Sequence, residues 1–301
     1  MRMEKKSKAR RRVRTRAALF LTLASFAGLL LLRILSVAIR AAGLSALALS
    51  AAGTLMCFLL PALAGLFLLD GDQSAMLPMR RLSAQHVLFL SIAGVLIVCP
   101  MSLLADMPGA AARLMGFALP EQAAVAPAGA LFLPYLLVSG LLAPICEELF
   151  FRGYLMETFA RSGRGRAVWT SALLFALAHG IDTAFLPRLL LGALLGDMVA
   201  RTGSLFASVL VHGCYNAALI VISFSGAGWL FSGYSMLSCA VRLMGTALCW
   251  GAYARVCRAR TSRVKAAILT GERLKRKDII LLAAACIATV AAIVTTGVMK
   301  P

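Results

Sequence analysis

The strongest constraint on this chain is a succession of long apolar runs, each close to the length of a membrane-spanning helix. A hydrocarbon core of ~30 Å takes about 20 apolar residues per helix. Nine runs of the 301-residue sequence approach that length and predict an all-α, polytopic transmembrane bundle. They lie at about 17–39, 42–69, 86–105, 125–150, 167–181, 185–200, 204–224, 235–254 and 279–298. The fifth and sixth runs are short and flank Pro187, so they also suit a re-entrant pair, which would leave eight full spans.

Composition supports the same class. Hydrophobic residues make up 61% of the chain and charged residues 14%, against about 25% charged in an average soluble domain. A soluble core of this size could not bury so much apolar surface, which excludes an ordinary cytosolic enzyme, a disordered chain and a secreted disulfide scaffold.

Basic residues are concentrated in two polar segments. Residues 2–16 and 255–277 hold nine Lys and Arg each, out of 31 in the chain, and both segments adjoin apolar runs. Such blocks are typical of cytoplasmic segments that bind anionic lipid. A nucleic-acid-binding tail is the rival interpretation, and the apolar composition disfavours it, so we expect no nucleic-acid partner.

The remaining basic residues predict an orientation. If the N-terminus lies in the cytoplasm, the outer loops contain only Arg40 and Arg113. The cytoplasmic loops then contain Arg80, Arg81, Arg161, Arg164, Arg166, Arg201 and the 255–277 block. This bias favours nine spans with a cytoplasmic N-terminus, in the cell membrane if the protein is prokaryotic.

Polar residues of three predicted spans fall in a regular pattern. The sequences are EELFFR at 147–152, FALAH at 175–179 and HGCYN at 212–216, and they include two of the three histidines in the chain. A charge at the centre of a membrane helix costs at least ~2.5 kcal/mol, so each one requires a partner or a function. We interpret Arg33, Arg188, Arg242 and His86 as snorkelling, interhelically bonded or interfacial residues.

The spacing within these sequences favours hydrolysis of an amide. Glu148 and Arg152 are four residues apart and can form an ion pair, whereas Glu147 is rotated ~100° away and stays outside that pair. A carboxylate can take a proton from water, and an imidazole can orient that water. A second imidazole and an amide N–H can stabilise an oxyanion, at ~3–4 kcal/mol per donor. An interhelical polar cluster and a proton-coupled transporter or channel are the alternatives.

Together the three motifs resemble those of the CAAX-protease and bacteriocin-processing (CPBP, or Abi) family of intramembrane proteases. The family pattern is E-E-x-x-x-R, F-x-x-x-H and H-x-x-x-N, and the similarity covers about residues 130–220. The resemblance implies an intramembrane endopeptidase in which Glu147 activates water with the help of His179. It also implies that His212 and Asn216 bind the oxyanion and that Glu148 and Arg152 accompany them, with Phe151 and Phe175 as walls of the cavity.

The resemblance leaves two questions open. The family has often been called metalloproteases, and Glu147, His179 and His212 are the set that could ligate zinc. The mechanism without a metal also uses Asn216, and we favour it. Some family members act instead as membrane scaffolds or bacteriocin-immunity proteins, and this is the main alternative function.

Four regions follow from these assignments. A basic cytoplasmic tail (1–16) precedes N-terminal transmembrane helices (17–124), a CAAX-protease-like core (125–224) and C-terminal transmembrane helices with the basic loop 255–277 (225–301). Because Glu147 lies near the end of the span at 125–150, we expect access from the cytoplasmic side. The expected substrate is a membrane-anchored protein or peptide; the sequence predicts neither its prenylation nor an oligomeric state.

Overall fold

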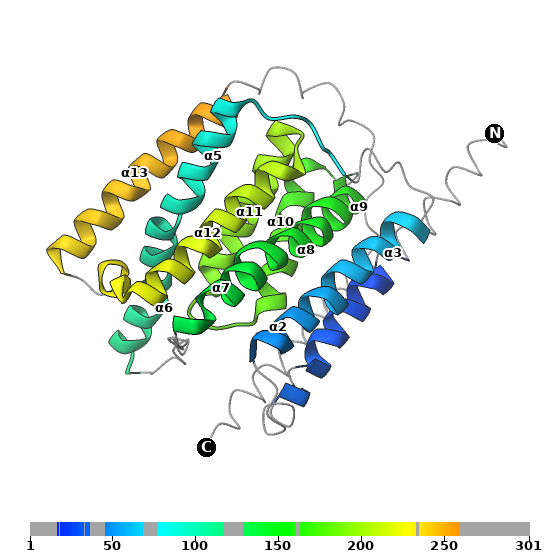
Figure 1. Cartoon of the computed structure of the whole chain (residues 1–301), viewed down its shortest axis with the longest axis horizontal. Coiled ribbons are helices and arrows are strands. Elements are labelled where there is room, and N and C mark those ends of the chain that lie inside the picture. The colour runs from blue at the N-terminus through cyan, green and yellow to red at the C-terminus, as the bar shows by residue number, and fades with distance from the viewer. Residues whose placement is uncertain are drawn as a thin grey trace.

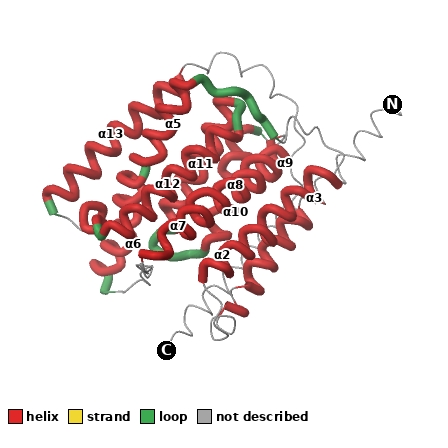
Figure 2. The backbone as a smooth tube through the Cα atoms, viewed as in Figure 1, coloured by secondary structure: helices red, strands yellow, loops and turns green. Residues whose placement is uncertain are grey.

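The structure is a computed structural model that describes residues 17, 19–32, 34–36, 46–68, 77–116, 129–160, 163–232 and 235–258. Within these ranges the chain is all-α (Figures 1 and 2), apart from an isolated bridge between Met79 and Ser204. The predicted tail 1–16, the ninth span 279–298, Arg33 and nearly all of the loop 255–277 lie outside the described residues.

Eight continuous helices make up the described part of the chain. The first runs over Leu19–Ser36. The second consists of α2 (Ala46–Thr54), η1 (Leu55–Leu59) and α3 (Leu60–Leu68), and the third of α5 (Ala84–Leu96) and α6 (Val98–Leu114). The fourth consists of η2 (Gly129–Leu131), α7 (Phe132–Tyr135), η3 (Leu136–Leu142), α8 (Ala143–Glu148), η4 (Leu149–Leu155) and α9 (Met156–Ala160). The last four are α10 (Arg164–His179), α11 (Phe185–Thr202), α12 (Leu205–Ser225), which the short η5 (Ala227–Phe231) follows, and α13 (Met236–Arg258).

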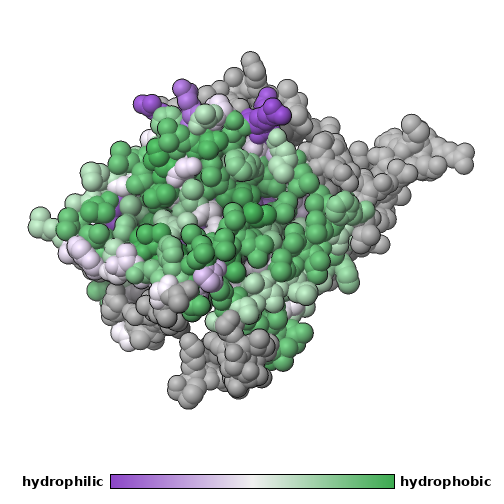
Figure 3. Space-filling model, in the orientation of Figure 1, coloured by the Kyte–Doolittle hydropathy of each residue, from purple (hydrophilic) through white to green (hydrophobic). Residues whose placement is uncertain are grey.

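Five of these helices are long and apolar enough to cross a membrane, which makes the protein a multi-pass integral membrane protein. They are Leu19–Ser36, Ala46–Phe67, Ala84–Ala111, Phe132–Ala160 and Leu205–Ser225. The face shown in Figure 3 is mostly hydrophobic and carries hydrophilic side chains at one end. The helices α10, α11 and α13 occupy the fifth, sixth and eighth predicted spans but do not meet both requirements, so a total of eight or nine spans remains a prediction.

The fourth helix is longer than the sequence predicts. The predicted span ends at residue 150, whereas the helix continues to Ala160. Two wide, π-helical segments, η3 and η4, lie within it on either side of α8. Arg152 marks the predicted end of the apolar run, yet it is buried and paired with Glu148. An arginine with its charge compensated does not have to lie at the membrane surface, so the helix continues past it.

Glycines end the helices that carry the site. Gly180 has φ 107° directly after α10, and Gly203 has φ 65° after α11. Both values lie in a region that side-chain-bearing residues rarely adopt, and each stops a helix within one residue. After Gly203 the chain is held by Leu205, whose N–H donates to the carbonyl of Pro78.

A Gly-x-x-x-Gly pair at 192 and 196 packs within the chain. An added Cβ at Gly192 would lie 3.0 Å from the Cα of Ala172, and one at Gly196 would lie 3.2 Å from the side chain of Val168. In a membrane this kind of close approach, rather than exclusion of water, holds helices together. The two glycines therefore let α11 lie against α10.

Two clusters of buried apolar residues flank the polar motifs. One joins the N-terminal helices to η4 and α10, with Phe58, Phe150, Phe151, Tyr154 and Phe175 among its members. The other joins α5, α11, α12 and α13, with Leu90, Leu195, Met198, Val211 and Cys249 among its members. Glu148, Arg152 and His212 are buried between elements of the two clusters, so the site is framed by rigid packing.

Replacing Gly192 by Ala should destabilise the bundle by about 1–3 kcal/mol, because the new methyl group meets the backbone of Ala172. The matched control is Gly251→Ala in α13, where an added Cβ meets nothing within 4 Å. It should be neutral or slightly stabilising, because alanine favours a helix more than glycine does. Unfolding by detergent denaturant would measure both, and equal stability of the two variants would contradict the packing argument.

Candidate active site

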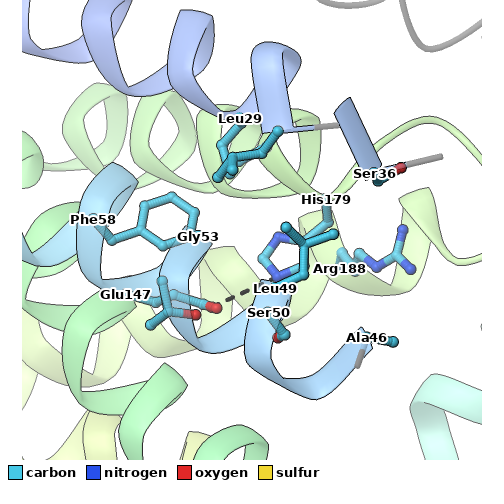
Figure 4. Close-up of a pocket in the computed structure, with 13 residues that line it drawn as sticks. Leu29, Ser36, Ala46, Leu49, Ser50, Gly53, Phe58, Glu147, His179 and Arg188 are labelled. Atoms are coloured by element: carbon cyan, nitrogen blue, oxygen red, sulfur yellow. Dashed lines mark ion pairs between the residues drawn. The ribbon is translucent and has the colours of Figure 1, made fainter. Parts of the chain in front are cut away.

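A cavity of about 430 Å³ reaches the first two motifs from between the N-terminal helices (Figure 4). Its charged and titratable lining residues are Glu147, His179 and Arg188. Most of the remaining lining is apolar or hydroxylated and comes from the first helix and from α2 and η1: Leu29, Leu32, Ser36, Ala46, Leu49, Ser50, Gly53, Thr54 and Phe58. The site therefore combines the core helices with helices that precede the motif region.

Glu147 faces two imidazole rings. Its Oε2 lies 3.6 Å from Nε2 of His179 and 3.9 Å from Nε2 of His212. The residue is 6% exposed, and Oε2 has no hydrogen-bond partner among the described residues. A buried acceptor without a partner is costly unless water or a ligand reaches it. The geometry thus brings together Glu147, His179 and His212, as the spacing predicts.

Both rings present an unprotonated Nε2 to Glu147 when they are neutral. Nδ1 of His179 lies 2.8 Å from the carbonyl oxygen of Phe175. Nδ1 of His212 lies 2.9 Å from Oε1 of Glu148. A carbonyl or carboxylate oxygen only accepts hydrogen bonds, so Nδ1 is the donor in each ring. The proton of the neutral imidazole is therefore on the side away from the site.

Glu148 lies at the centre of a buried network behind Glu147. Its Oε1 accepts from Nη1 of Arg152 at 2.6 Å as well as from His212. Nη2 of Arg152 donates to the carbonyl of Gly192 at 3.1 Å, which connects the pair to α11. Glu148 and Arg152 are 0% and 1% exposed. The predicted ion pair therefore forms and in addition fixes the ring of His212.

Phe175 packs against the same groups from α10. The Cζ atom of Arg152 lies 4.5 Å from the centre of its ring, a cation–π contact. The rings of His179 and His212 lie 4.6 and 5.6 Å away. Phe151 and Phe175 are expected to wall the cavity, but both are buried behind the polar groups, and Phe58 from η1 lines the cavity instead.

Asn216 lies one turn after His212 on α12 and bonds to the backbone. Its Nδ2 donates to the carbonyl of Ser139 at 2.8 Å. Ser139 belongs to the π-helical segment η3, in which wide turns leave carbonyl groups that side chains can bind. The bond uses one of the two N–H groups of the amide. The structure thus connects Asn216 to the helix that carries Glu147, while Asn216 is not among the residues that line the cavity.

The fit of these residues to zinc can be judged from their arrangement. Their donors are chemically suitable, because each ring nitrogen opposite Nε2 is held by an oxygen, as in many metal sites. Within the described ranges, however, no three His, Cys, Asp or Glu residues are arranged to hold a metal ion. The described geometry therefore does not fit the metal-ligand set of Glu147, His179 and His212, and we derive no step through a metal.

Glu147 lies further from the end of its helix than the sequence predicts, because the helix is longer than its apolar run. Glu147 is near the middle of the helix Phe132–Ala160, roughly 20 Å from its end at Ala160. The cavity extends to Ser36 and Ala46, where the first helix ends and α2 begins. These lie at the end of the bundle opposite the Met79–Ser204 bridge (Figure 1). Access from the cytoplasmic side stays a prediction.

Comparison with known families supports the resemblance. Residues 129–218 match the model of the type II CAAX prenyl endopeptidase Rce1-like family. This segment is Rce1-like. It coincides with the expected range of about 130–220 and contains all three motifs. No curated protein and no solved structure matches the chain.

Sequence reasoning missed two residues of the Rce1-like site, Phe58 and Arg188, whereas the bond of Arg242 to another helix is among the expectations for that residue. Phe58 precedes the matched segment and carries no motif. Arg188 is not isolated, because its Nη1 bonds to Oδ1 of Asp182 at 2.8 Å in the turn between α10 and α11. Arg242 also has a partner, Asp106 on α6, at 2.6 Å. The sequence signal for Arg188 was the nearby Asp182, six residues earlier.

Replacing Glu148 by Gln should lower the free energy of unfolding by about 3–5 kcal/mol, because it leaves the buried guanidinium of Arg152 without its counter-ion. The double variant Glu148→Gln, Arg152→Gln removes both charges and should be more stable than the single variant. Detergent-denaturant unfolding of both would test this. A double variant no more stable than the single one would show that the ion pair is not what the mutation breaks.

Proposed function

We propose that the protein is an intramembrane endopeptidase that hydrolyses a peptide bond of a membrane-associated protein or peptide. One observation carries the proposal. The buried carboxylate of Glu147 lines a cavity together with His179 and has an Oε2 without a hydrogen-bond partner among the described residues. A general base needs this kind of accessible but poorly solvated carboxylate. The match of residues 129–218 to an endopeptidase family supports the same function.

Glu147 and His179 activate water in this proposal. Their facing atoms are 3.6 Å apart, so a water molecule fits at hydrogen-bond distance from both. Glu147 takes one proton from that water while Nε2 of His179 accepts a hydrogen bond from the other. The resulting hydroxide attacks the carbonyl carbon of the scissile bond and forms a tetrahedral intermediate. Glu147 then returns the proton to the leaving nitrogen as the C–N bond breaks.

His212 and Asn216 stabilise the oxyanion. Because Nδ1 of His212 donates to Glu148, its Nε2 can donate only when the ring is protonated. Glu148 accepts from Nδ1 and holds the ring in this orientation, which makes Glu148 a positioning residue. The second N–H of the Asn216 amide supplies the other donor. Two such donors in a site without bulk water are worth several kcal/mol of transition-state stabilisation.

Replacing Glu147 by Gln, or His179 by Ala, should reduce cleavage at least about 10³-fold and leave the protein folded, because each removes a group that acts on the attacking water. The matched control is His86→Ala, whose ring bonds only to the exposed Ser83 among the described residues. The assay is cleavage of membrane-anchored quenched peptides by purified protein in liposomes, with and without 1,10-phenanthroline.

The outcomes separate the alternatives. Cleavage that requires Glu147 and survives the chelator supports the proposed mechanism. Activity lost to the chelator and restored by zinc would assign the three residues to a metal instead. Full activity of Glu147→Gln would refute the assignment of the base. Absence of cleavage of any peptide by the wild type would favour the scaffold or immunity function.

We also propose that the N-terminus lies in the cytoplasm and that the basic segments bind anionic lipid. The described Arg80, Arg81, Arg164 and Arg201 lie at or beside helix ends. Arg80 and Arg81 directly follow the Met79–Ser204 bridge, and Arg164 and Arg201 both pair with Asp197 of α11. Accumulation of arginine at one membrane surface is typical of the cytoplasmic side.

The orientation can be tested with Arg81→Cys and Gly228→Cys, because η5 lies at the opposite end of the bundle. In sealed right-side-out vesicles, a membrane-impermeant maleimide should label only residue 228 above the wild-type background. The reverse pattern would invert the proposed topology.

A further inference from the structure

Arg188 is the feature of the cavity that the proposed mechanism leaves unused. It lies at the start of α11, in the fourth position of the helix, and its side chain is 15% exposed. Figure 4 shows Glu147, His179 and Arg188 in sequence along the cavity, with Arg188 on the side near Ser36 and Ala46. Among the described residues that line this cavity, it is the only arginine or lysine. A cation in a largely apolar membrane cavity requires either a structural partner or a ligand.

The structural partner uses only part of the guanidinium. Asp182 Oδ1 accepts from Nη1 of Arg188 and also from the backbone N–H of Ala184. The Asp182 side chain is thus fixed by the turn and holds Arg188 in one orientation. An Arg side chain has five N–H donors in a planar fork. The described contacts of the side chain use Nη1, and Arg188 still lines the cavity, so donors remain for a second acceptor.

The guanidinium group of Arg188 favours an anionic ligand. A guanidinium binds a carboxylate in a planar, bidentate geometry, and such charge-assisted pairs are roughly twice as strong as neutral hydrogen bonds. A basic or neutral group would leave the remaining N–H donors without a charged acceptor. Conversely, a substrate carboxylate placed near Glu147 instead would meet a like charge. An anionic group is therefore favoured at the Arg188 end of the cavity and disfavoured at the Glu147 end.

We propose that Arg188 is a specificity-determining residue that binds a carboxylate of the substrate while the scissile bond lies at Glu147 and His179. The inference rests on the proposed peptidase function and adds a substrate class, namely peptides with a carboxylate on one side of the cleaved bond. The carboxylate comes either from the C-terminus of the peptide or from an acidic side chain. The apolar lining from Leu29, Leu49 and Phe58 takes the neighbouring hydrophobic side chains.

Binding can be measured separately from cleavage in the Glu147→Gln background. The probes are three fluorescent apolar peptides in detergent micelles. The first has a free C-terminal carboxylate and the second a C-terminal amide. The third has a C-terminal amide and a glutamate as its penultimate residue. We expect one of the carboxylate peptides to bind at least about tenfold more tightly than the plain amide. The identity of that peptide tells which source of carboxylate the site takes.

Adding Arg188→Gln to that background should remove the preference, because the affinity for the carboxylate peptide falls while the affinity for the amide peptide stays the same. The matched control is Arg201→Gln on the same helix, where Arg201 pairs with Asp197 at the other end and does not line the cavity. It should keep the preference. If Arg188→Gln does not fold, Arg188→Lys keeps the charge without the fork and should keep only part of the preference.

Several results would overturn the inference. The first is that the Glu147→Gln protein binds all three peptides with equal affinity. The second is that Arg188→Gln lowers the affinity for carboxylate and amide peptides equally. The third is that the Arg188→Gln variant still prefers the carboxylate peptide. The second would show a purely structural role with Asp182. The proposed function is judged independently, by whether wild-type protein cleaves any of the peptides and Glu147→Gln does not. A carboxylate preference without cleavage would support the binding site and refute the peptidase.

Discussion

The buried carboxylate of Glu148 is the interaction on which the site depends. It accepts from Arg152 on its own helix and from His212 on α12, while Arg152 also donates to the carbonyl of Gly192 on α11. Three helices are thus joined through one carboxylate in a region where unpaired charge is very costly. Because Gly192 has no side chain, α11 lies against α10 at this level. The close helix packing and the polar network therefore require each other.

Two adjacent glutamates receive opposite environments from this arrangement. Glu148 is 0% exposed and bonded to two cationic or ionisable partners, so it fixes the position of other groups. Glu147, rotated away from it on the helix, lines the cavity beside His179, whereas Glu148 is not among the described lining residues. Adjacent residues on a helix point about 100° apart. One glutamate of a Glu-Glu pair can therefore belong to a buried hydrogen-bond network while the other faces a cavity. This division explains why both are glutamates.

Much of this site follows from sequence because it depends on local spacing. The Glu148–Arg152 pair results from residues four apart on one helix, and the separate orientation of Glu147 results from the ~100° between adjacent helical residues. The approach of His179 and His212 to Glu147 joins different helices and was predicted from the three motifs taken together. The length of the fourth helix did not follow, because hydropathy treats Arg152 as exposed charge although Glu148 compensates it. Phe58 and the orientation of Arg188 depend on how distant helices pack, and no local pattern encodes that. The same limit applies to the cavity, which forms between helices that carry no motif.

The position of the cavity limits how a substrate reaches Glu147. A peptide bond has an N–H and a C=O that remain hydrogen-bonded within a helix, so a helical segment must unwind before hydrolysis. Its exposed polar groups then need partners inside the membrane. The cavity supplies them through the hydroxyls of Ser36, Ser50 and Thr54 and the charge of Arg188, next to apolar side chains of the same helices. In the proposed peptidase, the N-terminal helices, which lie outside the Rce1-like segment, therefore help to determine which unwound peptides are cleaved.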